Sequence, residues 1–495
     1  MSTTPPRLVI RGHDDVKGTY ATLSHCWGES PFLTLTTANI DQFRASLPVN
    51  ELARNFQDTI TVTKALGIRY CWIDSLCILQ SGEGSKQDWR SQSAEMNKIY
   101  KHAVINISAT GAAHADAGLF VNRNATSIPH QYVYWHDNQS RSNVFNGPKP
   151  FMLVHGSPYD EISRSRLRTR GWILQERLGS PRIIHFGPRQ VLFECRTGFR
   201  RRGVRSESLP YGYPDWMAKE YKQLSFENVV TGIVRNGRLP ETWKMVIEDF
   251  TQRELTRRTE DKFVALGATA LEYATIHGLR DEYIAGFFKS DIARQLGWAV
   301  MPEDLNSGLT SRARGAYRAP SWSWASMDGP VRMPSPPGAR TRVAIDYVSS
   351  QIQPVDANNT YGQLTDAEVV VKSQLVPITV RQKGPDAALH VSLVLGATPL
   401  PQTVCMDSRD IFDGKAVYPV DDTENFALLF LDYIYSDGMY EIGIGCSALI
   451  VQRLESLSPG SVHRYERVGK WWLTMPDQAV VKHLSDQPRV EVLLV

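Results

Sequence analysis

The sequence has few cysteines and no long apolar run. Its six cysteines are scattered over 495 residues without a CxxC pair, a usage typical of reduced, buried thiols rather than of a disulfide framework. No stretch approaches the ~20 apolar residues that a membrane-spanning helix needs, and Met1 to Asp15 contain no apolar segment of a secretory signal. The sequence therefore predicts a soluble, cytoplasmic protein without a membrane span.

The chain also lacks a charge excess and the motifs of common cofactors. Its formal net charge of +3 gives no reason to expect nucleic acid or an anionic membrane as the main partner. No P-loop, GxGxxG, HExxH or zinc-spaced set of cysteines and histidines occurs, so we expect neither a metal nor a cofactor. With 42% hydrophobic and 22% charged residues, the composition is globular, and the length favours two or three packed units.

Short apolar runs and helical periodicity alternate in the first part of the chain. Residues 20–24 and 70–73 are short and rich in aromatic and apolar residues, as buried strands are. A helix is expected between them, and a second one over about 87–102, before the β-branched run 104–108. This alternation predicts a parallel sheet with crossover helices.

The rest of the chain has three different patterns. The polar, breaker-rich stretch 124–150 is interpreted as an insertion in an α/β domain that covers 1–205. Residues 206–328 are expected to form a mainly helical extension. A Pro/Gly-rich stretch then opens 329–495, where short alternating apolar runs predict a mostly β C-terminal region.

Several sequence blocks follow one another in a particular order. Residues 20–28 read YATLSHCWG, residues 66–80 read LGIRYCWIDSLCILQ, and residues 170–178 read RGWILQERL. Further blocks are APSWSWAS at 319–326 and RYERVG at 464–469. Together these blocks resemble those of the fungal HET (heterokaryon incompatibility) proteins.

The resemblance implies a fold, a role and one departure from the family pattern. The N-terminal domain of HET proteins is similar to the TIR fold, a flavodoxin-like parallel sheet, and these proteins typically trigger cell death in self/non-self recognition. Some TIR domains cleave NAD with a glutamate on a helix. The HET family commonly has glutamate three residues after the tryptophan that corresponds to Trp89, where this chain has Gln92. Because an amide cannot ionise, we expect an effector that does not hydrolyse NAD if that cleavage depends on the acid. The alternative is that the acid is structural, in which case Gln92 changes little.

Polar residues follow the first two predicted strands. Ser24, His25 and Trp27 come at the end of the first strand, and Asp74 and Ser75 at the end of the second. Ligands of open parallel sheets bind beyond the carboxyl ends of the strands, so these residues predict a crevice, with His25 and Asp74 as catalytic candidates. A buried aspartate needs a partner, so we expect Asp74 to be hydrogen-bonded. The alternative is that Asp74 caps a turn and Trp27 belongs to the core.

Two helical segments contribute the other candidates. Trp89, Gln92 and Met96 fall at helical spacing and are predicted to face the sheet, with Gln92 as a polar group of the site. In the third block Glu176 is a candidate site acid. The alternative is a buried ion pair of a glutamate with Arg177, which would fix the helix.

Two classes of function remain open. The first is the HET-type effector, acting on a small molecule or a protein partner. The second is a cofactor-independent cyclase or Diels-Alder-type pericyclase of natural-product biosynthesis, which would need only hydrogen-bond donors such as Gln92, Ser24 and His25 to hold one substrate conformer. Trp322 and Trp324 alternate as on one face of a strand, and they could pack in a core or line a site for an apolar ligand.

Overall fold

The protein, seen in a computed structural model, divides into two compact units, residues 1–225 and residues 226–495. The domain boundary predicted near residue 205 and most of the insertion predicted at 124–150 lie outside the described residues, although the insertion contains a hairpin of β4 (Gln131–Trp135) and β5 (Lys149–Leu153). The structure describes residues 5–123, 131–135, 149–153, 158–195, 198–201, 241–301, 311–312, 316–334, 341–381, 390–392, 402–407, 426–434, 445–454, 463–474 and 478–495.

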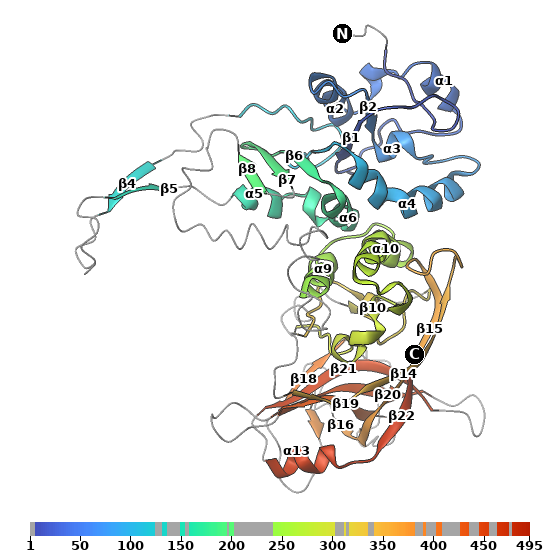
Figure 1. Ribbon diagram of the computed structural model, residues 1–495, viewed down its shortest axis with the longest axis vertical. Helices are drawn as coiled ribbons and strands as arrows, with labels where there is room; N and C mark the ends of the chain where they lie inside the picture. Colours follow the sequence, from blue (N-terminus) through green and yellow to red (C-terminus); the bar gives the residue numbers. More distant parts are fainter. Residues whose placement is uncertain are drawn as a thin grey trace. The chain divides into compact units, whose positions relative to one another are not determined.

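The first unit is built on a mixed sheet of six strands in the order β2-β1-β3-β6-β7-β8 (Figure 1). The strands are β1 (Tyr20–Ser24), β2 (Tyr70–Trp72), β3 (Ile105–Ser108), β6 (Arg182–Phe186), β7 (Val191–Cys195) and β8 (Gly198–Arg201). The first four strands in this order are parallel, which confirms the parallel arrangement predicted for the three N-terminal strands. β6, β7 and β8 pair antiparallel in turn, because the connections of four and two residues between them are too short for crossover helices.

The helices of this unit supply the crossovers. They are α1 (Ile40–Ala45), α2 (Arg54–Ala65), α3 (Asp74–Cys77), α4 (Ser85–His102), α5 (Pro158–Ser163) and α6 (Gly171–Gly179). Helix α2 connects β1 to β2, and α3 and α4 connect β2 to β3. Helices α4 and α6 contact each other (Figure 1).

The two faces of this sheet differ in chemistry. One face carries apolar strand residues such as Leu23 and Ile107, which are buried in one core together with Phe43 and Phe56 of α1 and α2. The intervening strand residues, which point to the other face, include six buried polar side chains, namely Thr22, Ser24, Asn106, Ser108, His185 and Glu194. Contacts with α4 and α6 cover these polar groups. A parallel sheet is usually apolar on both faces, so this buried polar face distinguishes the unit.

Helix α4 is rotated from its predicted orientation. Its buried residues are Ser93, Met96, Asn97 and Tyr100. Met96 is therefore buried as predicted, but Gln92 is only half-buried, at the border of this face. The Tyr100 hydroxyl sets the rotation by donating a hydrogen bond of 2.9 Å to the carbonyl oxygen of Leu23 in β1.

The second unit combines helices with a β-rich sheet, as the sequence predicted. Its helices are α9 (Glu241–Thr251), α10 (Arg258–His277), α11 (Ile292–Gln295) and α13 (Gln478–Ser485). The main sheet follows the order β13-β19-β20-β21-β22-β15-β14, β18 pairs with β21, and a further pairing of β15 with β19 joins two distant members of the order. These strands are β13 (Thr341–Val343), β14 (Asp346–Pro354), β15 (Leu364–Pro377), β18 (Gln402–Met406), β19 (Phe426–Ile434), β20 (Gly445–Arg453), β21 (Arg464–Thr474) and β22 (Arg489–Leu494).

Trp322 and Trp324 belong to the core of this second unit. Both side chains are fully buried. The predicted strand is wrong at this position, because Trp324 begins a short 3-10 helix, Trp324–Ser326, whose N-cap is the Ser323 hydroxyl. The Trp324 indole donates to the carbonyl oxygen of Gly286 at 3.2 Å, and the Trp322 ring lies beside Phe287.

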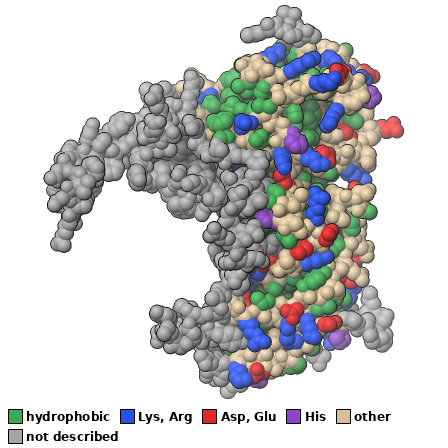
Figure 2. All heavy atoms as spheres, viewed as in Figure 1, with side chains coloured by type: hydrophobic (Ala, Val, Ile, Leu, Met, Phe, Trp, Pro, Cys, Tyr) green, Lys and Arg blue, Asp and Glu red, His purple; other side chains and the backbone are tan. Residues whose placement is uncertain are grey.

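Charged side chains are mixed on the surface. On the face shown in Figure 2, lysines and arginines are interspersed with aspartates and glutamates over the described residues. Among the helices that the structure describes, none is both long and apolar enough to cross a membrane.

Candidate functional site

The topology of the first unit defines a switch point between β1 and β3. The chain leaves β1 to form β2 on one side, and then crosses to form β3 on the other side of β1. At such a point the connections diverge at the carboxyl ends of the two strands, which is where open α/β sheets place their ligands. Ser24 and Ser108 are the last residues of β1 and β3 and are direct neighbours in the register.

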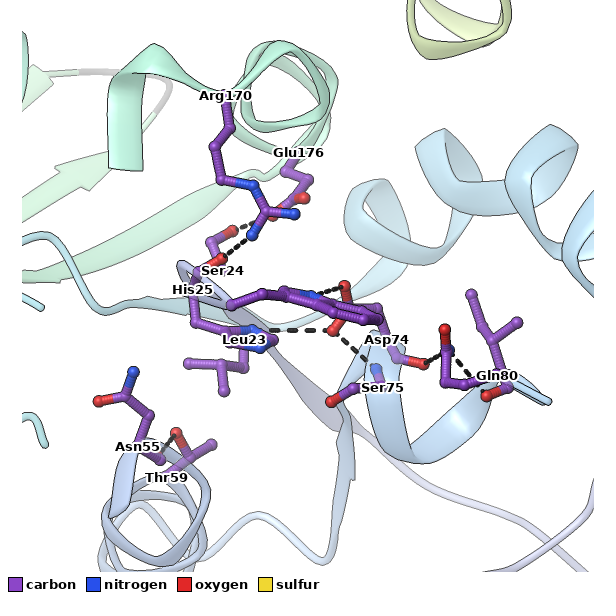
Figure 3. Close-up of polar contacts among 12 residues, drawn as sticks. Leu23, Ser24, His25, Asn55, Thr59, Asp74, Ser75, Gln80, Arg170 and Glu176 are labelled. Atoms are coloured by element: carbon purple, nitrogen blue, oxygen red, sulfur yellow. Dashed lines mark hydrogen bonds and ion pairs between the residues drawn. The ribbon is translucent and has the colours of Figure 1, made fainter. Parts of the chain in front are cut away.

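A buried carboxyl group, Glu176, lies at this switch point (Figure 3). Glu176 comes from α6 and accepts a hydrogen bond from the Ser24 hydroxyl, which itself accepts one from the Asn106 amide at 2.9 Å. Burial is the main reason why the pKa of Glu176 rises from 4.5 to about 7; the Asp74 carboxylate also raises it, whereas the Ser24 hydroxyl and Arg170 lower it. At neutral pH both the acid and the carboxylate are populated, as proton transfer requires.

Asp74 has the hydrogen-bonding partners that the sequence predicted. The Trp27 indole donates to its Oδ2 at 3.0 Å, and the backbone N–H of Ser75 donates to its Oδ1 at 2.7 Å (Figure 3). Asp74 is the first residue of α3, whose N-cap is Ile73, and no side-chain hydrogen bond caps this helix. The carboxylate therefore binds Trp27 and the adjacent Ser75 N–H without acting as the helix cap.

His25 lies beside this carboxylate but is buried. Its Nδ1 is 3.7 Å from Oδ1 of Asp74, and its ring packs edge-to-face with Phe56 at 5.0 Å between centroids. Burial lowers the pKa of His25 from 6.5 to about 4, and the opposing effect of Asp74 is smaller. His25 is therefore neutral at physiological pH and can act as a hydrogen-bonding group rather than as a cation.

Arg170 joins the two parts of the cluster. Its Nη1 donates to the carbonyl oxygen of His25 at 2.6 Å, and its charge lowers the pKa of Glu176 (Figure 3). We did not predict Arg170, Asn106 or Tyr100 as site residues. The signal for Asn106 was available, since an amide inside a β-branched run indicates a polar position on a strand face.

A second buried chain of polar groups crosses the same face of the sheet. The His185 ring contacts the Thr110 hydroxyl through Nδ1 at 3.1 Å and Glu194 through Nε2 at 2.7 Å, and Arg177 binds the Glu194 carboxylate through two nitrogens at 3.1 and 3.2 Å. Because a carboxylate only accepts, Nε2 donates to Glu194 and the Thr110 hydroxyl donates to Nδ1. Arg177 thus pairs with Glu194, which leaves Glu176 for Ser24.

The other predicted residues lie around this cluster or away from it. Ser75 is fully buried next to Asp74. Met96 is buried on the same side of α4 as Ser93 and Tyr100. Trp89 is half-buried and meets Trp172 of α6 edge-to-face, with 6.2 Å between the ring centroids.

Across the described ranges, no group of three His, Cys, Asp or Glu side chains could hold a metal ion.

These features define an α/β domain with a buried acid at its topological switch point. Residues 20–176 match the family described as heterokaryon incompatibility protein (HET). This segment is a HET domain, as the sequence blocks indicated. The match runs from the start of β1 to Glu176, so the resemblance of the blocks beyond it stays a prediction. Searches of curated proteins and of solved structures gave no match.

Proposed function

We propose that the chain is a self/non-self recognition or cell-death effector whose HET domain binds a small molecule at the switch point. One observation carries the proposal: Glu176, a buried acid with a pKa of about 7, hydrogen-bonds to Ser24 at the carboxyl end of β1. A buried carboxyl group that is half-ionised at neutral pH is more typical of a functional site than of a purely structural role. Asp74, Trp27 and Arg170 supply further polar groups next to it.

The role of Glu176 can be tested by expressing the full chain in a filamentous fungus. We expect wild-type protein to arrest growth and Glu176→Gln to lose this effect, because an amide of nearly the same shape cannot transfer a proton. Glu95→Gln is the matched control, since Glu95 is exposed and pairs only across the surface with Lys98 at 2.7 Å. Immunoblots must show equal protein levels. Growth arrest by Glu176→Gln as strong as that of the wild type would reject the proposed role of Glu176.

The proposed function does not include NAD hydrolysis. Gln92 occupies the position where the family commonly has glutamate, and its half-buried amide cannot ionise. We therefore expect purified wild-type protein to consume no NAD above the buffer rate, and Gln92→Glu to restore turnover if the rest of the site is intact. NAD is assayed for both proteins, with folding checked by thermal melting. Robust cleavage by the wild type would refute this expectation and point to Glu176 or Asp74 as the acid.

A cofactor-independent cyclase or pericyclase is the second candidate. It is favoured by the fraction of Glu176 that stays protonated at neutral pH, because a neutral carboxylic acid can donate a proton or a strong hydrogen bond to a substrate. The gene neighbourhood discriminates between the two functions. Polyketide or terpene genes beside this gene would favour the enzyme, whereas a lone polymorphic locus would favour the effector.

A further inference from the structure

The second unit contains a buried arginine, Arg318, with one edge of its guanidinium unused. Its side chain is 2% exposed, and Nη1 donates to Oδ1 of Asp328 at 2.8 Å. The other two nitrogens, Nε and Nη2, are buried and have no hydrogen-bond partner in the part of the chain that the structure describes. Arg318 directly precedes the APSWSWAS block at 319–326, to which the proposed function assigns no role.

The two unused nitrogens are adjacent donors on the same side of the planar guanidinium. They present parallel N–H groups, which match two oxygen atoms of a carboxylate or a phosphate. Leaving a buried donor without a partner costs free energy, and a charged donor costs more. This cost indicates a missing acceptor.

Another buried arginine of the same unit shows how the fold satisfies such a group. Arg467 binds Asp407 through Nε and Nη2 at 2.9 and 3.1 Å, and it donates to the carbonyl oxygens of Leu296 and Trp298 at 2.7 and 2.6 Å. In Arg467 the edge formed by Nε and Nη2 is filled by a carboxylate. In Arg318 the equivalent edge has no hydrogen-bond partner among the described residues.

A second buried cation, Lys262, lies next to Arg318. Its ammonium group is 5.8 Å from the ring centroids of both Phe250 and Trp324, and it forms no hydrogen bond or ion pair with the described residues. Burial is the main reason why the pKa of Lys262 falls from 10.5 to about 7, and the charge of Arg318 lowers it further. The aromatic surroundings exclude water, which strengthens the attraction of any anion that enters.

The charges of this cluster do not balance. Arg318, Arg258 and Asp328 are the charged groups around Lys262, so one carboxylate faces two arginines and a lysine that is partly protonated at neutral pH. Asp328 and Arg258 have side chains that are 19% and 59% exposed, which places the cluster close to the surface of the unit. An added anion would offset the positive excess and supply the missing acceptor.

We propose that Arg318 and Lys262 form a binding site for a small oxyanion, either a carboxylate or a phosphate group. Two oxygen atoms of the anion pair with Nε and Nη2 of Arg318, and Lys262 adds a second positive charge. The Trp324 and Phe250 rings line the site with apolar surface. This site is independent of Glu176 and of the proposed function of the HET domain.

The test is calorimetric titration of the full chain with sodium phosphate and, in a second arm, with sodium acetate, in chloride buffer of constant ionic strength. We expect saturable binding of at least one anion to the wild type and at least tenfold weaker binding to Arg318→Met. Arg342→Met, at an exposed arginine of β13, should bind as the wild type does. The arm that gives the tighter binding identifies the class of anion.

Arg318→Lys keeps the proposal testable if Arg318→Met does not fold. Lysine retains the charge that pairs with Asp328 but lacks the two parallel donors. We expect a melting temperature near that of the wild type together with anion binding at least tenfold weaker. The absence of binding of both anions to the wild type, or unchanged binding to a folded Arg318→Lys protein, would overturn the proposed site.

Discussion

Replacing Arg467 with methionine is expected to destabilise the second unit by about 3–5 kcal/mol, because the change leaves a buried carboxylate without its guanidinium. Arg467 and Asp407 are both fully buried, and two nitrogens of the arginine bind the two carboxylate oxygens. The guanidinium also lies 3.3 Å from the centroid of the Trp298 ring. Urea unfolding followed by tryptophan fluorescence measures the loss, and hydrogen exchange of peptides from β21 locates it.

The same strand offers a matched control. Arg464 pairs with Glu368 at 2.8 Å, but its side chain is 41% exposed, so Arg464→Met should cost only about 0–1 kcal/mol. The double variant Arg467→Met/Asp407→Leu should recover part of the stability, since removing both charges leaves none buried. Equal unfolding curves for Arg467→Met and Arg464→Met would show that the buried pair contributes little.

Replacing Glu176 with glutamine is expected to make the protein about 3 kcal/mol more stable than the wild type at pH 8, with little difference near pH 4. The folded state holds a proton on Glu176 up to a pH of about 7, whereas the unfolded chain releases it near the ordinary value of 4.5. The folded state binds more protons in this window, so the stability of the wild type falls as the pH rises from 4.5 to about 7. Glutamine does not titrate and removes this slope.

The measurement is the urea midpoint of both proteins between about pH 5 and pH 8. Glu95→Gln changes the same kind of residue at an exposed position and should follow the wild-type curve. Parallel pH profiles of wild type and Glu176→Gln would mean that the folded state does not raise the pKa of this carboxyl.

Much of the first unit could be predicted from local sequence. The strands at 20–24, 70–73 and 104–108 are short apolar runs flanked by helical periodicity, and the observed strands differ by at most one residue at either end. That Asp74 has a hydrogen-bonding partner was also expected, because a carboxylate at the end of an apolar strand must be hydrogen-bonded when it is shielded from water. The strands and the need for such a partner depend on adjacent residues, so they can be read from the sequence, whereas the identity of the partner, Trp27, 47 residues away, cannot.

The orientation of α4 could not be predicted in the same way. Helical spacing alone allows Trp89, Gln92 and Met96 to face the sheet, but the structure buries Ser93 and Tyr100 with Met96 instead. Polar side chains can occupy a buried helix face when the face of the sheet beneath them is itself polar. The polarity of that sheet face depends on the strand order, which places polar residues of different strands side by side.

The sequence by itself determined the α/β class of the N-terminal region, the HET blocks and the polar residues that follow β1 and β2. Only the tertiary structure decided that Ser24 meets Glu176, 152 residues away, and that Arg177 pairs with Glu194. Only it showed that two buried nitrogens of Arg318 have no hydrogen-bond partner within the described ranges. The physical reason is that strand order, register and helix packing bring distant residues together, and the pKa of a buried group depends on those neighbours rather than on the adjacent sequence.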